Sequence, residues 1–517
     1  MESHPNRDFA HTIMNFIDKG VPTFYEGPDL DQVYKNWRSC EILSQEVSDN
    51  IKREVSLGRK LGPFPKPPLP RYVGSPMGAY QKHLSNRVKT RVITDLSWPP
   101  YNSVNHFIDK ELCRVSYVTI DDAVSLIKSC GKKALLLKVD IEDAYRNIVV
   151  QPEDWHLLGT TWQVNGVLHY YLDTRLPFGL RSSARLFSMF AEALRFMMVK
   201  NGAINTINYL DDFLSVTPHC EELGNVNKTV VLRTCEQSGF PINTKKTVGP
   251  VTELEFLGIV IDTDNMELRM STERLNNVRA ELLSWLGKRS GTKRQLLSLL
   301  GKLVFMSRII KPGRIFMRRI ITCTSKLKQL HHKVRLSREA RSDISWWLSF
   351  TEVWNKKSVF YDDEWMCADN DLCFFTDASL YGIGGVLQKQ WFAAKIPDTY
   401  TIKNIAWKEL YALIVACATW GKHFAGKKII INCDNNAIVH SVNNGSSKTP
   451  ELMTLIRRLY FIQAYHNFEL KLKYVQSRLN IADLPSRLKI QRFLADYPEM
   501  RRIEPTFNSE LYSDPTE

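Results

Sequence analysis

At 517 residues the chain is too long for one hydrophobic core, since domains typically hold roughly 100 to 200 residues. Its 44% hydrophobic and 24% charged residues exclude a disordered or fibrous class, and no apolar run approaches the roughly 18 residues that cross a bilayer. The net charge of +14 predicts a polyanionic partner, because lysine and arginine release counterions when they neutralise phosphates. We therefore expect several folded domains and no membrane partner.

The N-terminal residues lack the basic and then apolar pattern of a secretory signal, so we expect an intracellular protein, in the cytoplasm, the nucleus or both. Residues 1–60 are predicted to form a helical N-terminal extension, because apolar residues between Trp37 and Val55 recur at helical spacing. Gly62-Pro63 and the prolines as far as Pro70 end this pattern.

Residues 61–270 alternate short β-rich runs with helical stretches, which predicts an α+β region. Strands are expected at 134–139 and 207–210, and an amphipathic helix at 182–199. Asn165-Gly166 predicts a hairpin, because this pair accepts the two positive φ values of a type I′ turn.

Residues 271–330 change to helical periodicity and carry most of the positive charge. From Leu282 to Arg338 there are 15 Lys or Arg and no Asp or Glu, whereas a solvated helix face normally mixes both signs. We expect this segment to contact nucleic acid, although the cluster from Lys311 to Arg319 would also suit a nuclear signal. Its apolar stripe should face a core and comprises Leu296, Leu299, Leu300, Leu303, Val304 and Ile310.

A second α+β unit is expected at 371–490, after a connection at 331–370. The unit is predicted to run through a strand, a glycine-rich turn and another strand, then a helix at 403–424 and a strand at 428–433. Residues 491–517 are expected to form a C-terminal tail.

Three carboxylates are placed to converge in the first α+β region. The expected strand at 134–139 leads to Asp140, and Asp211 and Asp212 occupy a predicted hairpin turn about 70 residues later. Three carboxylates can hold two divalent cations, which stabilise the attacking and leaving oxygens of a phosphoryl displacement. Adjacent acids alone more often mark a turn, so the interpretation depends on the combination.

Several motifs in order resemble those of reverse transcriptases. They are Lys138-Val-Asp140-Ile-Glu-Asp143-Ala144-Tyr145, Leu176-Pro-Phe178-Gly179 and Tyr209-Leu-Asp211-Asp212, followed by Phe256-Leu257-Gly258, which resembles the primer-gripping turn. With the segment around Arg91, they cover about 170 residues. The resemblance implies an RNA-directed DNA polymerase of the right-hand type, with fingers and palm at 61–270 and a basic thumb at 271–330.

The resemblance also implies roles for single residues. Asp140, Asp211 and Asp212 would hold the metal ions, with the backbone carbonyl of Ile141 as a further ligand. Tyr145 matches the side chain that excludes a 2′-hydroxyl, the alternative being a core tyrosine.

Arg91 resembles the finger arginine that clamps the incoming triphosphate. Lys246 resembles the lysine near the leaving pyrophosphate, with Lys245 as an alternative. Gly179 would let the backbone approach nucleotide or template closely, unless it serves an ordinary strand-to-helix turn. The expected nucleotide-binding residues are Arg91, Asp143, Ala144, Tyr145, Phe178, Gly179 and Lys246, and the expected primer- and template-binding residues are Phe256, Leu257, Gly258, Lys293, Arg294 and Lys302.

A second set of acids lies on successive elements of the 371–490 unit: Asp377, Glu409, Asp434 and Asp483. They resemble the Asp-Glu-Asp-Asp set of RNase H, which implies an RNase H-like α/β domain that cleaves RNA in a hybrid by the same two-metal chemistry. The glycines of Gly382-Ile-Gly384-Gly385 are expected to permit a tight reversal between strands. The histidine usual before the last motif is replaced by Tyr474, which leaves the efficiency of cleavage or product release open.

Further segments resemble DIRS-type or closely allied retrotransposons, among them Gly58-Arg-Lys-Leu-Gly62, Asp95-Leu-Ser-Trp-Pro99 and Cys433-Asp-Asn435. Other long-terminal-repeat classes remain the alternative. No aspartic-protease, integrase or convincing tyrosine-recombinase pattern occurs, so other element-encoded proteins are candidate partners if those activities are needed.

Together these features predict an enzyme of retrotransposon replication that uses two Mg²⁺ or Mn²⁺ ions in each active site. The expected partners are an RNA template, a DNA primer, an RNA–DNA hybrid and deoxynucleoside triphosphates. An inactive or domesticated nucleic-acid-binding remnant is the alternative. An RNA-dependent RNA polymerase is disfavoured, because removing RNA from a hybrid serves a purpose only when DNA is made.

Overall fold

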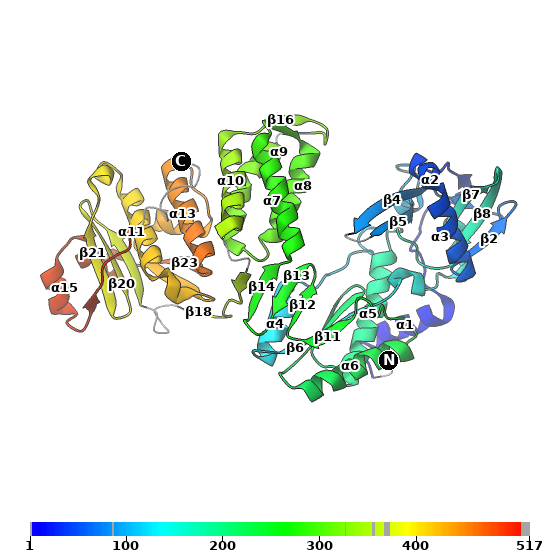
Figure 1. The fold of residues 1–517 in the computed structure, drawn as a ribbon, viewed down its shortest axis with the longest axis horizontal. Helices are drawn as coiled ribbons and strands as arrows, with labels where there is room; N and C mark the ends of the chain where they lie inside the picture. Colours follow the sequence, from blue (N-terminus) through cyan, green and yellow to red (C-terminus); the bar gives the residue numbers. More distant parts are fainter. Residues whose placement is uncertain (1–2, 85–86, 326, 354–356, 367–372, 508–517) are drawn as a thin grey trace. The chain divides into compact units, whose positions relative to one another are not determined.

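The computed structural model describes residues 3–84, 87–325, 327–353, 357–366 and 373–507. The chain divides into two compact units, residues 1–254 and 255–517, which are described separately (Figure 1). Both units combine helices and sheets, as the sequence predicted. Among the described residues, no helix combines the length and the apolar character needed to cross a bilayer.

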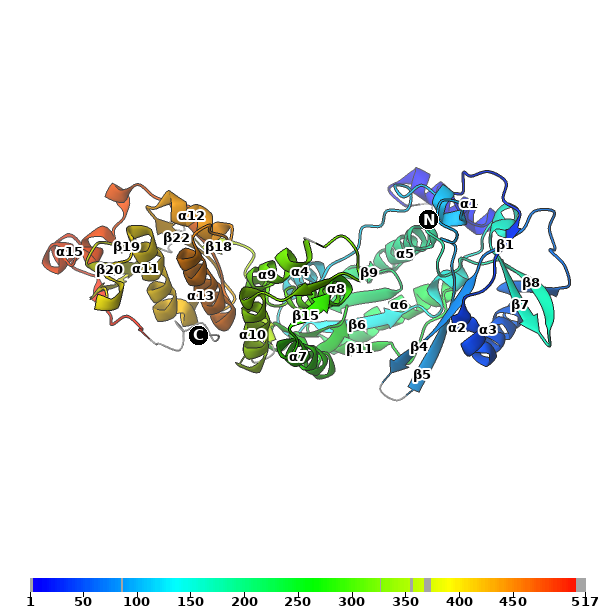
Figure 2. The same cartoon turned by 90° about the horizontal axis from the view of Figure 1, so that it is seen from above.

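The first unit begins with a five-stranded sheet built from distant segments. Its strands in spatial order are β1 (Gln32–Val33), β3 (Val73–Gly74), β7 (Gly159–Val164), β8 (Val167–Asp173) and β2 (Lys60–Phe64). A separate hairpin consists of β4 (Met77–Leu84) and β5 (Arg87–Thr94). Helices α2 (Arg38–Ile42) and α3 (Ser44–Ser56) lie between this hairpin and strands β7 and β8 (Figures 1 and 2).

The helical extension expected at 1–60 also contributes a strand to this sheet. The segment contains α1 (Arg7–Lys19), α2 and α3, but it also supplies β1, which pairs in parallel with β3. Val47 and Ile51 of α3 are buried in one cluster with Met77 of β4 and Trp162 of β7. A 3.6-residue periodicity identified the helices but carried no signal for a two-residue strand, whose existence depends on its partner.

The expected hairpin at Asn165-Gly166 is confirmed. Strands β7 and β8 pair antiparallel up to Val164 and Val167, and the two turn residues have φ values of 50° and 79°. Both values are positive, as a type I′ turn requires.

A four-stranded sheet forms the centre of the rest of the first unit. Its order is β11 (Val248–Val251), β6 (Leu135–Asp140), β10 (Asp212–Thr217) and β9 (Thr206–Tyr209). Helices α4 (Ile120–Cys130), α5 (Ser183–Lys200) and α6 (Glu221–Gln237) pack against it. Val139, Phe187 and Phe213 are fully or almost fully buried in its core. The strands and the helix expected at 134–139, 207–210 and 182–199 are therefore confirmed to within one or two residues.

The second unit starts with a small sheet and a helical bundle. The sheet consists of β12 (Glu253–Phe256), β13 (Ile259–Asp262), β14 (Glu267–Met270) and β17 (Lys357–Val359). Helices α7 (Thr272–Gly287), α8 (Lys293–Met306), α9 (Arg318–Ser325) and α10 (Arg338–Val353) lie side by side in the bundle (Figures 1 and 2). The predicted apolar stripe lies mainly on α8, where Leu296, Leu299 and Leu303 are buried. The prediction is wrong for Val304, which is 47% exposed.

The expected connection at 331–370 is also corrected, because α10 belongs to the bundle. Arg341 of α10 donates a hydrogen bond to the carbonyl of Leu286 on α7 at 2.8 Å. Trp346 stacks on Phe316, with ring centroids 3.4 Å apart. The acidic stretch after α10 suggested a linker, but Trp346 and Trp347 before it are core residues.

A large mixed sheet organises the remainder of the second unit. Its main strands are β19 (Phe374–Ala378), β20 (Gly382–Leu387), β21 (Gln390–Lys395), β22 (Lys428–Cys433) and β23 (Glu469–Tyr474). Strand β22 runs parallel to β19 and β23, while β19, β20 and β21 are antiparallel neighbours. The sheet lies between α11 (Ile405–Trp420) and α15 (Ile490–Asp496) (Figures 1 and 2).

Two short strands extend this sheet. They are β18 (Trp365–Met366), which pairs with β22, and β24 (Arg501–Arg502), which pairs in parallel with β21. The expected C-terminal tail at 491–517 is thus corrected as far as residue 507, since α15 and β24 belong to the folded unit. Phe493 of α15 is fully buried against Trp391.

Two candidate carboxylate sites

Asp140, Asp211 and Asp212 come together where β6, β9 and β10 meet. Antiparallel pairing of β10 with β6 places Asp212 opposite Asp140. Asp211 occupies the turn between β9 and β10, and its carbonyl accepts a hydrogen bond from the amide of Ile141 at 3.0 Å. Three acids predicted from separate motifs are therefore neighbours in one sheet.

Lys246 supplies a positive charge to this first site. Its Nζ donates hydrogen bonds to both carboxylate oxygens of Asp140, at 3.0 and 2.8 Å. Burial disfavours the charged lysine, but the hydrogen bond and the charge of Asp140 outweigh this effect and raise the pKa of Lys246. The sequence left Lys245 and Lys246 as alternatives, and this contact belongs to Lys246.

The surroundings of the other two acids, Asp211 and Asp212, favour either protonation of the carboxylates or binding of a cation. Burial raises the pKa of Asp212 to about 6, and the charges of Asp211 and Asp140 add to the shift. Burial also raises the pKa of Asp211. Carboxylate oxygens are the ligands that hard divalent cations prefer, and a cation would offset this buried negative charge. The donor set fits a divalent metal.

A pocket of about 400 Å³ lies beside the three acids. Asp211 lines it together with three residues expected at a nucleotide site, Arg91, Asp143 and Phe178. Arg91 is exposed and donates a long hydrogen bond of 3.5 Å to the hydroxyl of Tyr80. The structure thus brings these separate motifs to one cavity.

Tyr145 lies next to this pocket rather than in its lining. Its ring centroid is 5.3 Å from that of Phe178 and 5.5 Å from that of Phe187. Burial raises its pKa to about 12. Both expectations for Tyr145, core packing and proximity to the sugar, are compatible with this half-buried position. Ala144 is buried in the core, and the pocket lining does not include it.

Gly179 makes a close backbone approach, but the neighbour is the chain itself. It has a φ of 113°, and a Cβ at this position would overlap the carbonyl oxygen of Thr94. Asn105, buried and without a predicted role, fixes this contact by donating to the carbonyl of Gly179 at 2.8 Å and to Ser97 at 2.9 Å. Only glycine fits here without strain.

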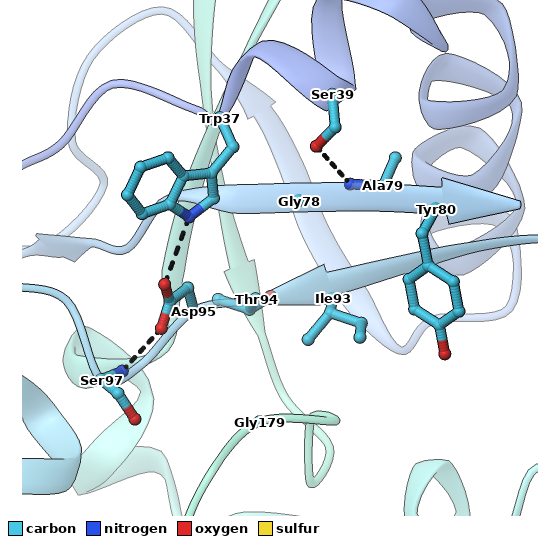
Figure 3. Close-up of a pocket in the computed structure, with 10 residues that line it drawn as sticks. All are labelled: Trp37, Ser39, Gly78, Ala79, Tyr80, Ile93, Thr94, Asp95, Ser97 and Gly179. Atoms are coloured by element: carbon cyan, nitrogen blue, oxygen red, sulfur yellow. Dashed lines mark hydrogen bonds between the residues drawn. The ribbon is translucent and has the colours of Figure 1, made fainter. Parts of the chain in front are cut away.

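Both partners of this contact, Gly179 and Thr94, line a second pocket of about 330 Å³ (Figure 3). Gly179, Thr94 and Tyr80 line it, and the Trp37 indole donates a hydrogen bond to Asp95 at 3.2 Å. Trp37 is 40% exposed. Residues from the expected N-terminal extension therefore border both pockets.

The expected primer- and template-binding residues belong to the second unit or to its edge. Leu257 and Gly258 form the turn between β12 and β13, with φ values of 51° and 78°. Phe256 is fully buried, so its side chain is a core group. That part of the prediction is corrected, because the alternation of strand β12 turns this ring inward.

The basic residues expected on α8 differ in their surroundings. Lys293 donates a hydrogen bond to the carbonyl of Leu327 at 2.6 Å, and Lys302 forms an ion pair with Glu281. Arg294 is exposed. Contact with nucleic acid stays a prediction for all three, and Arg294 needs the least rearrangement to make it.

The second set of acids also converges, on the mixed sheet of the second unit. Asp377 lies on β19 and Asp434 directly follows β22, while Glu409 lies on α11 and Asp483 begins α14 (Asp483–Ser486). Asn435 caps α12 (Asn436–Asn443), so the chain turns away just after Asp434. Ligand atoms of Glu409 and Asp434 lie within 4.8 Å of each other and of Cys433.

Burial and mutual repulsion raise the pKa of two of these acids, Glu409 and Asp377. Burial raises the pKa of Glu409 to about 8, with contributions from Asp434 and Asp377. Burial raises the pKa of Asp377 to about 7, although the Ser486 hydroxyl, which donates to Asp377, opposes the shift. One oxygen of Glu409 is buried without a hydrogen-bond partner in the described part of the chain. This orphaned oxygen fits a divalent metal.

Of the glycines after Asp377, Gly382 takes part in the predicted reversal, at its last position. Ser379 closes that turn, since its amide donates to the carbonyl of Gly382 at 2.8 Å. Gly382 and Gly384 lie within β20, where a Cβ on Gly384 would be 2.6 Å from the amide nitrogen of Ser486. The glycines also let α14 approach β20, which brings Asp483 and Ser486 to Asp377.

Two neighbours of the second site were not predicted, Ser486 and Cys433. A serine three residues after Asp483 gave no separate signal, and Cys433 was interpreted only as part of a motif. Tyr474, which replaces the usual histidine, is 50% exposed and pairs in register with Cys433 at the end of β23.

Comparison with known proteins identifies the class to which the first site belongs. Residues 81–261 match the family model for reverse transcriptase (RNA-dependent DNA polymerase), so the chain contains a reverse transcriptase domain. Protein P of duck hepatitis B virus (strain China) is 29% identical over 133 residues, which are 26% of this chain and 16% of the relative. Protein P of heron hepatitis B virus is 27% identical over 144 residues, 28% of this chain and 17% of the relative. The match thus spans about a sixth of these relatives.

Solved structures of a foamy viral protease-reverse transcriptase in complex with double-stranded DNA share the fold. One has a TM-score of 0.52 at 14% identity and covers 91% of this chain and 79% of its own. Another has a TM-score of 0.50 at 15% identity and covers 91% of this chain and 94% of its own. The fold class predicted from the sequence, a right-hand polymerase followed by an RNase H-like domain, is confirmed.

Proposed function

We propose that the chain is an RNA-directed DNA polymerase with an attached ribonuclease H that degrades RNA in RNA–DNA hybrids. The single observation that carries the polymerase half is the convergence of Asp140, Asp211 and Asp212 beside a pocket lined by Arg91 and Phe178. The match of residues 81–261 to the reverse transcriptase family supports the same activity.

Asp140, Asp211 and Asp212 would hold two Mg²⁺ or Mn²⁺ ions, with the carbonyl of Ile141 as a further ligand. When bound, such ions offset the charge that develops on the attacking and leaving oxygens of a phosphoryl transfer. Arg91 faces the same pocket and would bind the triphosphate through its guanidinium fork. Lys246, which donates a hydrogen bond to Asp140, would stabilise the departing pyrophosphate. Catalysis is then mainly positioning and electrostatics.

The ribonuclease H half rests on Asp377, Glu409, Asp434 and Asp483. Their residue types match what hydrolysis with two divalent ions requires, and the unpartnered oxygen of Glu409 supports a metal there. Tyr474 stands at the end of β23, exposed, where a histidine is usual. We expect it to lower the rate of cleavage or product release without removing the activity.

We place the chain in a DIRS-type or closely allied retrotransposon, on the strength of the sequence motifs. Its substrates would be an RNA template, a DNA primer and deoxynucleoside triphosphates, and its location the cytoplasm, the nucleus or both. The viral relatives and the foamy viral structures leave other reverse-transcribing elements as the alternative.

Primer extension on an RNA template tests the polymerase. Deoxynucleotides and Mg²⁺ or Mn²⁺ are supplied to the wild-type chain and to the variant Asp211→Asn/Asp212→Asn. DNA from the wild type alone supports the proposal. No product from folded wild-type protein that still binds the hybrid would favour the inactive remnant instead.

A further inference from the structure

A buried ion network lies between α3, β2 and β8 in the first unit, and the carboxylate chemistry does not account for it. The Arg146 guanidinium donates to Glu54 at 2.9 Å and to Asp173 at 2.6 Å. Lys60 donates to the other oxygen of Asp173 at 2.8 Å. All four charged side chains are less than 8% exposed.

This network costs desolvation energy that an apolar cluster would avoid. Replacing a buried ion pair by well-packed hydrophobic residues is often neutral or stabilising, so stability alone does not explain four buried charges. Charge-assisted hydrogen bonds differ from apolar packing because they fix direction as well as distance. The question is which segments this network orients.

Arg146 connects the segments that supply the nucleotide pocket. It directly follows Tyr145, and its Nη1 donates to the carbonyls of Arg175 and Leu176 at 3.3 and 3.5 Å. Leu176 begins the loop that carries Phe178, whose ring packs against Tyr145. One guanidinium therefore bonds the loop that presents Phe178 and lies next to Tyr145.

The N-terminal segment completes the arrangement. Arg59 donates to the carboxylate of Asp143 at 2.6 Å, and Asp143 has a left-handed φ of 51° just before Tyr145. Arg53, Glu54 and Lys60 line the same pocket as Asp211 and Arg91. The segment expected to be a peripheral extension thus forms one wall of the pocket.

We propose that Arg146, held between Glu54 and Asp173, is a positioning residue that sets Tyr145 and Phe178 for nucleotide selection, and that α3 and β2 are part of the nucleotide site. The inference rests on the proposed polymerase function. Arg146 also lines the pocket, and the role proposed for it is to position the two rings.

Single-nucleotide insertion on an RNA template tests the proposal. One variant is Arg146→Lys, which keeps the positive charge but loses the forked guanidinium. The other is Glu54→Gln, which removes the negative charge and keeps a side chain of similar size. Arg59→Gln removes the hydrogen bond to Asp143 and a 3.9 Å contact with Glu54, leaves the hydrogen bonds of Arg146 and Lys60 in place, and serves if either of the first two variants fails to fold. Arg71→Gln is the matched control, since it breaks an exposed ion pair with Asp29 in the same unit.

We expect the network variants to raise KM for the deoxynucleotide about tenfold, and to lower the preference for deoxynucleotide over ribonucleotide about tenfold, with kcat changed less than about threefold. The Arg71→Gln control should match the wild type in KM, in nucleotide preference and in kcat. A purely structural role would lower the unfolding temperature and the active fraction while KM and preference stay unchanged.

Two negative outcomes are distinguishable. If the wild type makes DNA and the folded variants keep its KM and its nucleotide preference, the positioning role is overturned and the polymerase proposal stands. If the folded wild type makes no DNA, the proposed function fails, and this inference fails with it.

Discussion

The two carboxylate sites balance their negative charge in different ways. In the first, Lys246 donates two hydrogen bonds to the buried Asp140, so the protein supplies its own cation. In the second, Asp377 accepts a hydrogen bond from the neutral hydroxyl of Ser486. One oxygen of Glu409 there lacks a partner among the described residues.

The pKa values follow this difference. At the first site burial raises the pKa of Asp212 to about 6, whereas at the second site burial raises that of Asp377 to about 7 and that of Glu409 to about 8. Without metal, burial therefore favours the protonated forms of Asp377 and Glu409. Two sites with the same metal chemistry should thus respond differently to pH, because the cation of the second site, Arg487, pairs with Asp483 and not with Asp377 or Glu409, whose pKa values are raised.

The largest expected effect separates the two sites by single substitutions. Asp140→Asn should lower DNA synthesis at least about a hundredfold and spare hybrid cleavage, while Asp377→Asn should do the reverse. Both activities are measured on one preparation of each variant. Loss of both activities in a folded variant would contradict two independent sites.

Two glycines allow a second, structural test. Gly384→Ala would press on the amide of Ser486, and Gly179→Ala on the carbonyl of Thr94 at a left-handed φ. We expect the first to lower hybrid cleavage and the second to lower synthesis, each about tenfold, because small displacements misalign catalytic groups.

Gly166→Ala is the control for the glycine variants. Its φ is also positive, at 79°, but a Cβ there meets nothing within 4 Å and the turn lies away from both sets of acids in the sequence. Equal losses in Gly166→Ala and Gly179→Ala would mean that strain at a positive φ, rather than the close approach to Thr94, causes the effect at Gly179.

A smaller effect concerns pH and metal. Asp377 and Glu409 bind protons more tightly in the folded state than in the unfolded state, so the stability of the metal-free protein should fall as pH rises from about 4 to about 8. Mg²⁺ competes with these protons. Its stabilisation should therefore grow through pH 7 to 8, by roughly 2 to 4 °C in unfolding temperature.

Thermal unfolding of the wild type and Asp377→Asn at pH 6 and pH 8, with and without Mg²⁺, measures this response. The variant removes one of the two titrating acids, so its Mg²⁺ response should change less with pH. An unfolding temperature that rises equally with Mg²⁺ at both pH values would rule out proton competition at the second site.

The smallest expected effect concerns Lys246, the cation that pairs with Asp140 at the first site. Lys246→Gln should tighten Mg²⁺ binding at the first site about two- to fivefold, since an exposed lysine contributes little energy but competes directly for Asp140. Calorimetric titration in the Asp377→Asn background isolates that site. Lys245→Gln is the control, and equal shifts for both lysines would contradict a specific contact of Lys246.

The sequence by itself determined both sets of acids and much of the local structure. The β-rich run at 134–139 placed Asp140 at the end of a strand, and Asn165-Gly166 specified a hairpin turn. Such features depend on residues close together in the chain, where periodicity and φ preferences act directly.

Only the tertiary structure decided which residues line the nucleotide pocket. The bond from Arg146 to Glu54 joins residues 92 positions apart, and neither residue carries a motif that names its partner. The role of Gly384 likewise emerged only when α14 was seen to lie on β20. Long-range partners depend on how complete surfaces pack together, which the local spacing of residue types does not encode.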